Sequence, residues 1–200
     1  VLQRTALELA GNSCIALDDV QARKQILVSR SVRPRVSDYQ KLRSFIAGYI
    51  SRAAEKLRSQ HSLAKNVSVF IKTKTINVHE NNYTNIININ LSQYTADTAT
   101  LIRAACWALH KIYKPGYEYY QAGIMFNDLI PDKHQQYAMF APANYDAAAR
   151  KRMQLLDSVN RRFGPETLCL ASEPRQRWQM YQQHLSPAYT TRWDELLHVK

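Results

Sequence analysis

The 200-residue chain lacks the features by which membrane proteins and most enzymes are recognised. No apolar run approaches the roughly 18–20 residues that a helix needs to cross a bilayer. Glycine occurs only five times and forms no phosphate-binding loop. No HExxH, GxSxG or paired-carboxylate motif is present. We therefore expect neither a membrane protein nor a catalytic site within this chain.

Cysteine is also scarce, with Cys14, Cys106 and Cys169 far apart and no CxxC pair. This odd number argues against a disulfide framework and a structural zinc site, and a reducing cytoplasm is the simplest location. Two short pairs could hold a metal ion, Asp18-Asp19 and His79-Glu80. We interpret the first as part of a linker and the second as a solvated loop, and expect no metal or other cofactor in this chain.

Positive charge, in contrast, is abundant. Lysine and arginine number 27 against 16 acidic residues, which gives a formal net charge of +11. A hydrophobic fraction of 46% with 22% charged residues indicates a globular chain. The charge favours a polyanionic partner, namely DNA, RNA or an anionic membrane, although a generic basic protein remains an alternative.

Hydrophobic periodicity predicts the order strand, helix, strand, strand, helix, strand. The strands are expected at residues 24–32, 66–74, 85–92 and 119–128. One helix follows Ser37-Asp38, and the second begins after Asp97 and stops before Pro115-Gly116. This order predicts an α+β fold, a ferredoxin-like split βαβ domain.

Two helices cover only one face of a sheet, so the other face meets solvent or a partner. On the middle strands that face would carry Ser68, Lys72, Lys74, Asn88 and Asn90, which suit phosphate and sugar contacts. A merely solvated face is the alternative. Which face the first strand presents to a partner is ambiguous, because its basic residues and most of its apolar residues occupy even-numbered positions and so point to the same side.

The last third of the chain does not continue this pattern of strands and helices. Residues 131–145 are expected to form a linker, and a helix is expected from Asp146 to Phe163, ended by Gly164-Pro165. Residues 167–171 could be a short strand. The tail beyond them is polar and aromatic.

Several segments resemble one known family. They are Ser29-Arg30-Ser31, Arg52–Ser59, Phe70–Thr73, Leu185–Arg192 and Leu196–Lys200. The resemblance is to the little-finger domain and C-terminal extension of the UmuC, MucB and RumB group of Y-family translesion DNA polymerases. It covers essentially the whole chain.

The resemblance implies a division of the chain. Residues 1–22 would be the end of the thumb and a linker, 23–130 the little-finger DNA-binding domain, 131–145 a linker, and 146–200 a mostly helical C-terminal extension. The polymerase active site, with its Mg²⁺, would lie upstream. The absence of an initiator methionine, with an uncapped helix at the start, agrees with an upstream region.

The resemblance also implies partners. Template-primer DNA would lie on the open sheet face, with the contacts expected at Lys24, Ser29, Arg30, Ser31, Lys72, Thr73, Lys74, Asn88 and Asn90. A UmuD′-like dimer and RecA are further expected partners, without assigned residues.

A clamp-binding pentapeptide follows the little finger in this family: glutamine, two variable residues, an aliphatic residue, then phenylalanine. Gln136, Tyr137, Ala138, Met139 and Phe140 match it, with methionine as the aliphatic residue. Met139 and Phe140 would enter a groove of the β sliding clamp. Alternatively, these residues pack on their own domain.

Two other classes of protein remain to be weighed. An RNA-binding module of the RRM kind shares the topology, but it places stacking aromatics on its central strands, and here only Phe70 lies there. An independent enzyme with a ferredoxin-like core would need a catalytic cluster, which the chain lacks.

Overall fold

The computed structural model describes residues 2–14, 23–73, 82–134 and 143–173. A short helix, α1 (Leu2–Leu9), comes first in the chain. The main domain follows in the order β1 (Ile26–Val36), α2 (Tyr39–Ser59), β2 (Ser62–Thr73), β3 (Thr84–Thr95), α3 (Thr98–Ile112) and β4 (Tyr119–Pro131). A 3₁₀ turn, η1 (Asp132–His134), and a last helix, α4 (Ala143–Phe163), complete the described elements. The predicted α+β fold and its βαββαβ order are confirmed.

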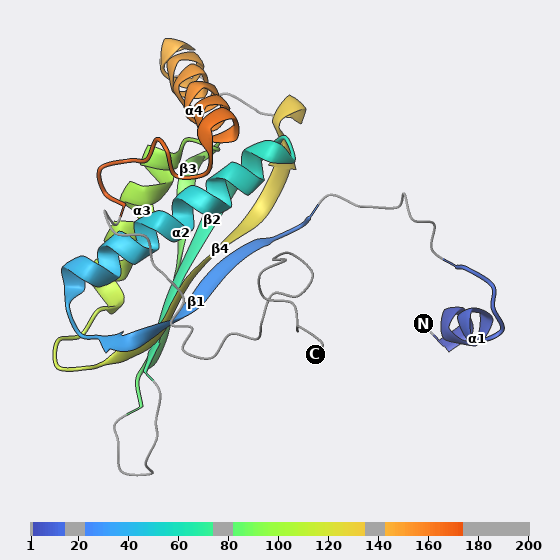
Figure 1. Cartoon of the computed structure of the whole chain (residues 1–200), viewed down its shortest axis with the longest axis horizontal. Helices are drawn as coiled ribbons and strands as arrows, with labels where there is room; N and C mark the ends of the chain where they lie inside the picture. Colours follow the sequence, from blue (N-terminus) through green and yellow to red (C-terminus); the bar gives the residue numbers. More distant parts are fainter. Residues whose placement is uncertain (1, 15–22, 74–81, 135–142, 174–200) are drawn as a thin grey trace, which may run out of the picture.

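The four strands form one antiparallel sheet in the order β1-β4-β2-β3. Each strand–helix–strand unit is split, because β4 lies between β1 and β2, and β2 lies between β3 and β4. The second strand of each unit is therefore central, and the first is at an edge. Figure 1 shows α2 and α3 on one side of this twisted sheet.

Both domain helices begin where the sequence predicts. The Asp38 carboxylate accepts hydrogen bonds from the amides of Gln40 and Lys41 at 3.3 and 3.0 Å. Asp97 accepts one from the Thr100 amide at 2.9 Å. These bonds satisfy amides that have no partner within the helix, and each such cap typically contributes about 1 kcal/mol.

The hydrophobic core lies between the helices and the sheet. Its side chains without solvent exposure include Leu42, Ile46, Ile50 and Leu57 of α2, Leu101 and Leu109 of α3, and Val67, Val69, Ile71, Ile124 and Phe126 of the sheet. Burying each side chain of this size contributes about 1.5–3 kcal/mol. The core fixes which sheet face is covered, and so which face stays open.

The final helix packs on the outer side of α2 through polar contacts. Arg58 forms two hydrogen-bonded contacts with Asp157 of α4, Nε to Oδ2 at 2.6 Å and Nη2 to Oδ1 at 2.7 Å. Its Nη1 donates to the Ala96 carbonyl and the Thr98 hydroxyl, at 3.0 and 2.8 Å. A single guanidinium thus connects α2, α4 and the start of α3.

One predicted element is wrong, since residues 167–171 form turns in place of a short strand. The Asn160 side chain pairs with the backbone of Leu168, accepting from its amide at 2.8 Å and donating to its carbonyl at 2.9 Å. These bonds satisfy backbone groups that a strand would need for a neighbour.

The predicted linker is also shorter than expected at both ends, because β4 extends to Pro131 and α4 begins at Ala143. In the part of the chain that the structure describes, no helix is long and apolar enough to span a membrane.

Candidate nucleic-acid interface

The open face of the sheet is built of four cross-strand rows, which follow from the register of the strands. The rows, each written from β1 or β4 toward β3, are Asn127-Asn66-Asn90, Leu27-Met125-Ser68-Asn88, Ser29-Gly123-Phe70-Ile86 and Ser31-Gln121-Lys72-Thr84. Alternate residues of the same strands, such as Val67 and Ile124, point to the covered face. The open face therefore has an amide-rich end, a partly apolar centre and an end that carries Lys72.

Asparagine side chains are linked to one another at the first end. Asn66 donates from Nδ2 to Oδ1 of Asn90 at 2.6 Å. Asn127 donates to Oδ1 of Asn66 at 3.2 Å and to the Ser68 hydroxyl at 2.9 Å. Ser68 is fully buried in this network, while Asn88 and Asn90 stay exposed. The network orients amides whose free groups can meet phosphate or sugar oxygens.

The centre of the face depends on a glycine. A Cβ atom at Gly123 would clash with the Phe70 ring and with Cβ of Ser29, so only glycine lets the ring lie against β4. Leu27 and Ile86 flank this centre with 56% and 52% of their surface exposed. Exposed aliphatic side chains on adjoining rows give the open face a contact area beyond simple charge.

Lys72 is the cation that the described open-face rows contribute. It is exposed, and its Nζ lies 5.6 Å from the centre of the Phe70 ring, within range of a cation–π contact. These four rows are thus polar and amide-rich, with Lys72 as their cation.

The structure brings together five of the predicted DNA contacts and places two others away from them. Ser29, Ser31, Lys72, Asn88 and Asn90 share the open face. Two of the remaining contacts lie elsewhere in β1 and β2. Arg30 pairs with Ala122 on the covered face, which settles the ambiguity of the first strand. Thr73 accepts a hydrogen bond from the Tyr83 amide at 2.8 Å, at the end of β2.

Other predicted residues fall at or beyond the described parts of the domain. Lys24 is exposed just before β1. Lys74 and the clamp pentapeptide, residues 136–140, lie outside the described residues. Their roles stay predictions. Sequence reasoning missed Gly123, Met125 and Asn127, although the alternation of the last strand could have placed all three opposite the buried residues.

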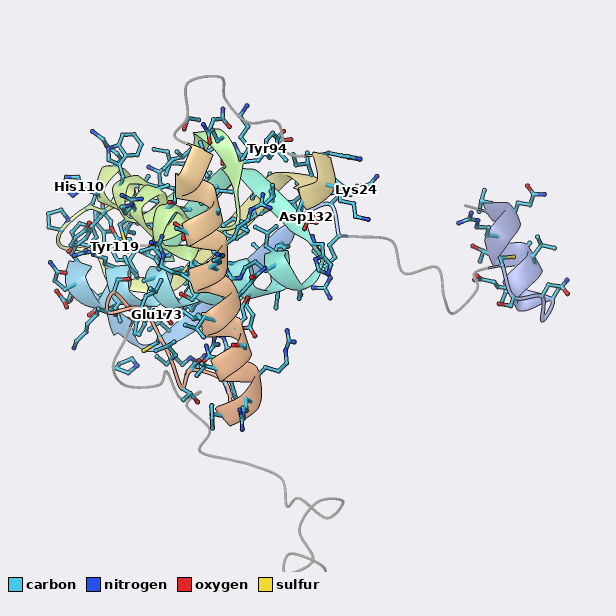
Figure 2. All side chains as sticks on the ribbon, turned by 90° about the horizontal axis from the view of Figure 1, so that it is seen from above. Lys24, Tyr94, His110, Tyr119, Asp132 and Glu173 are labelled. Carbon is cyan, nitrogen blue, oxygen red and sulfur yellow. The ribbon has the colours of Figure 1, made fainter. Side chains whose placement is uncertain are left out.

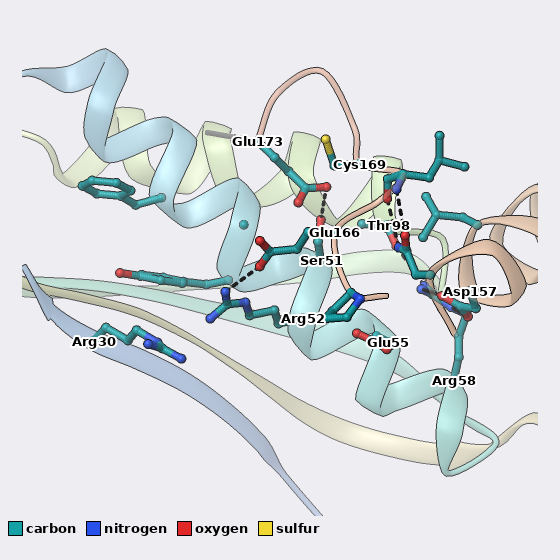
Figure 3. A pocket seen from close by; sticks show the side chains of 17 residues that line it. Arg30, Ser51, Arg52, Glu55, Arg58, Thr98, Asp157, Glu166, Cys169 and Glu173 are labelled. Carbon is teal, nitrogen blue, oxygen red and sulfur yellow. Dashed lines mark hydrogen bonds and ion pairs between the residues drawn. The ribbon is translucent and has the colours of Figure 1, made fainter. Parts of the chain in front are cut away.

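A hollow lies on the helix side of the domain, between α2 and the segment that follows α4, with a volume of about 610 Å³. Figure 3 shows Arg52 paired with Glu166 and Ser51 bonded to Glu173, at 2.6 and 2.7 Å. These contacts neutralise much of the lining. Among the described residues, no three histidine, cysteine or acidic side chains come together as metal ligands would.

Tyr49, a residue of α2, lines this hollow. Burial of its hydroxyl raises its pKa to about 12, although the nearby Arg30 and Arg52 act in the opposite direction. The hydroxyl is buried and has no hydrogen-bond partner among the described residues. An unpartnered buried hydroxyl lowers the stability of the folded chain.

Fold and open face together define a one-sheet α+β domain whose polar face is left uncovered. A model of the impB/mucB/samB family C-terminal domain matches residues 23–139. Because this match covers more than half of the chain, the chain belongs to the impB/mucB/samB family, and the resemblance drawn from its residues is confirmed. A domain of unknown function (DUF4113) matches residues 150–199.

Curated relatives agree with this membership. Protein UmuC of Salmonella typhimurium is 38% identical over 202 residues, which cover 100% of this chain and 48% of that protein. Protein SamB of Salmonella typhimurium is 37% identical, with 100% and 47% covered, and protein MucB of Escherichia coli is 37% identical, with 96% and 46% covered. The chain thus spans about half the length of the curated relatives it matches.

Solved structures show weaker likeness. An insertion ternary complex of Dbh DNA polymerase has a TM-score of 0.44 at 12% identity, over 64% of this chain and 35% of that chain. A complex of β-clamp processivity factor and the little finger domain of PolIV has a TM-score of 0.38 at 14% identity, over 58% and 99%. Both TM-scores are low, and neither likeness assigns a function to this chain.

Proposed function

We propose that this chain is the region of an error-prone translesion DNA polymerase of the SOS response that grips duplex DNA and recruits partners in the cytoplasm. The family match over residues 23–139 carries the proposal, because it includes all four strands and therefore the open face. The polymerase active site and its Mg²⁺ would belong to the remaining half of the protein.

The chemistry of the open face supports a grip on the DNA backbone. Phosphate and sugar contacts come from lysine and arginine, from polar side chains such as serine and asparagine, and from backbone amides, and they carry no sequence information. Lys72, Asn88 and Asn90 offer such groups in exposed positions. A polymerase needs this kind of contact, because its grip must hold at every template position.

Salt-dependent binding tests the grip. We expect Lys72→Gln with Lys74→Gln to lower the slope of log affinity against log salt by about 2 on duplex DNA, about 1 for each phosphate contact. Lys56→Gln is a control, because Lys56 is exposed on α2, away from the open face. An unchanged slope, or tighter binding of single-stranded RNA than of duplex DNA, would contradict the proposal.

Recruitment of the β sliding clamp is the second part of the proposal, and residues 136–140 carry it. We expect Met139→Ala with Phe140→Ala to abolish retention of the chain on immobilised clamp, because both apolar anchors are lost. Tyr137→Ala is the matched control, since this position varies in the motif. Retention of the double variant would refute the assignment.

A UmuD′-like dimer and RecA complete the proposed partners. Their binding is proposed from family membership alone, and we assign no residue to it.

A further inference from the structure

The described side chains of α4, residues 147–163, present charge of one sign to solvent. The basic residues Arg150, Lys151, Arg152, Arg161 and Arg162 are all exposed. The acidic residue of this stretch, Asp157, points inward and is paired with Arg58 at 2.6 Å. The outer surface of α4 therefore carries an excess of positive charge along its length.

The helix turns these cations outward because its apolar side is anchored. Ala149 and Met153 are 2% and 5% exposed, so this side of α4 faces the domain. Lys151, Leu155 and Arg162 fall on the opposite ridge, at helical spacings of four and seven residues. Figure 2 shows α4 running along the outside of the helix layer, with its side chains projecting away.

The dimensions of this ridge fit a nucleic-acid backbone. From Lys151 to Arg162 the helix rises about 16 Å, at about 1.5 Å per residue. One strand of DNA carries a phosphate every 3.4 Å or so, and about five phosphates would face that length. The Arg162 guanidinium lies 5.3 Å from the Phe163 ring, which supports it on the surface without consuming its hydrogen-bond donors.

An acidic protein is the other class of polyanionic partner. Protein interfaces are centred on packed apolar anchors, with charged residues depleted from the core. Leu155, 63% exposed, lies on the described ridge between Lys151 and Arg162. Phe163, 65% exposed, lies at the end of the helix against the Arg162 guanidinium, so the exposed apolar side chains are interleaved with cations. This composition favours phosphate over a protein surface.

We propose that α4 is a second nucleic-acid site, which binds the phosphate backbone independently of the open sheet face. Because α4 packs on the helix side of the sheet, a straight stretch of DNA on the open face cannot also touch it. The site would therefore hold a separate segment, either single-stranded or duplex. It gives a role to the start of the domain of unknown function matched at residues 150–199.

Binding to oligothymidine and to random duplex, each titrated over salt, tests this site in the whole chain. The variant replaces Lys151, Arg152, Arg161 and Arg162 with glutamine. We expect its salt slope to fall by about 3–4 on at least one of the two ligands. The ligand that responds identifies the segment bound.

A control variant removes the same four charges elsewhere, at Lys41, Arg43, Lys56 and Lys133, which are also exposed. It should change either slope by less than about 1, because only general charge is lost. Equal slopes for the α4 variant and the wild type, or equal losses in both variants, would overturn the proposal. The Lys72 variant tests the open face separately, so the proposal for α4 can be refuted without refuting the proposal for the open face, and the reverse.

A benzophenone side chain at position 155 provides a second readout that does not depend on charge removal. Irradiation should join this position to the responding nucleic acid. A chain that forms adducts with no DNA, or only with a second copy of itself, would equally overturn the proposal.

Discussion

At the scale of single residues, the open face depends on Gly123 more than on any charged side chain. Glycine at this position lets the Phe70 ring lie across β4 and places Lys72 beside it. A larger residue would lift the ring and disturb two rows at once. The shape of the proposed DNA-binding surface is therefore set by a residue that cannot itself make side-chain contacts with DNA.

Gly123→Ala should lower the free energy of unfolding by about 1–3 kcal/mol, as overpacking typically does. Denaturation in urea measures this loss. In a Phe70→Ala background the loss should shrink, because one of the two clashes is gone, while the contact with Ser29 remains. The same loss of stability in both backgrounds would show that the position of the Phe70 ring does not depend on Gly123.

The buried Tyr49 hydroxyl makes a second prediction at this scale. Tyr49→Phe should leave stability unchanged or raise it by up to about 1 kcal/mol, because an unpartnered buried hydroxyl is removed. A loss of more than about 1 kcal/mol in urea denaturation would mean that the hydroxyl has a partner.

Alkaline pH provides an independent check on Tyr49. Its pKa is near 12 in the folded chain and near the ordinary 10.0 when unfolded, so the folded state binds more protons between these values. Stability should therefore fall as pH rises from 10 to 12, with the contribution fully present below 10. The fall should be smaller in Tyr49→Phe than in the wild type.

At the scale of elements, Arg58 should hold α4 more strongly than Arg52 holds the segment that follows it. The Arg58 and Asp157 side chains are 14% and 19% exposed, and Arg58 makes two further hydrogen bonds. Arg52 and Glu166 form an equally short contact but are 38% and 35% exposed. We expect the burial of the pair, and not the distance between its atoms, to determine how much each pair contributes to stability.

Arg58→Ala should cost about 2–4 kcal/mol, since it leaves Asp157 and two oxygen acceptors without their partner. Arg52→Ala should cost less than about 1 kcal/mol. Hydrogen exchange should show faster opening of α4 in the first variant alone. Similar exchange in both variants would contradict this ranking.

The elements show how far the sequence could predict this fold. Asp38 and Asp97 marked both helix starts, because capping is a local interaction. The pairing of the strands depends on partners distant in the chain, and the backbone at residues 167–171 depends on a side chain outside that segment, since Asn160 bonds to Leu168. Arg30 was ambiguous since it shares parity with Ile26 and Val28, and only pairing with β4 places it.

At the scale of the whole molecule, we propose that the open sheet face and the outer ridge of α4 bind different segments of nucleic acid. The open sheet face offers amides, hydroxyls and Lys72, while the outer ridge of α4 offers an excess of cations. Among the described residues, exposed cations thus lie on the helix side as well as on the open sheet face. Sequence composition predicted nucleic-acid binding, but it could not assign the charge to a surface, because helix faces and sheet faces are set by packing.

Photo-crosslinking to duplex DNA tests the central claim, that the open sheet face meets DNA, most directly. Position 86 on the open face and position 107 on the outer side of α3 are equally accessible, with 52% and 55% of the native side chain exposed. In the variant that lacks the four α4 charges, so that DNA bound by α4 does not reach the helix side, a benzophenone group placed at each position in turn should form adducts with duplex DNA from position 86 and few or none from position 107. Adducts from position 107 with none from position 86 would contradict the account.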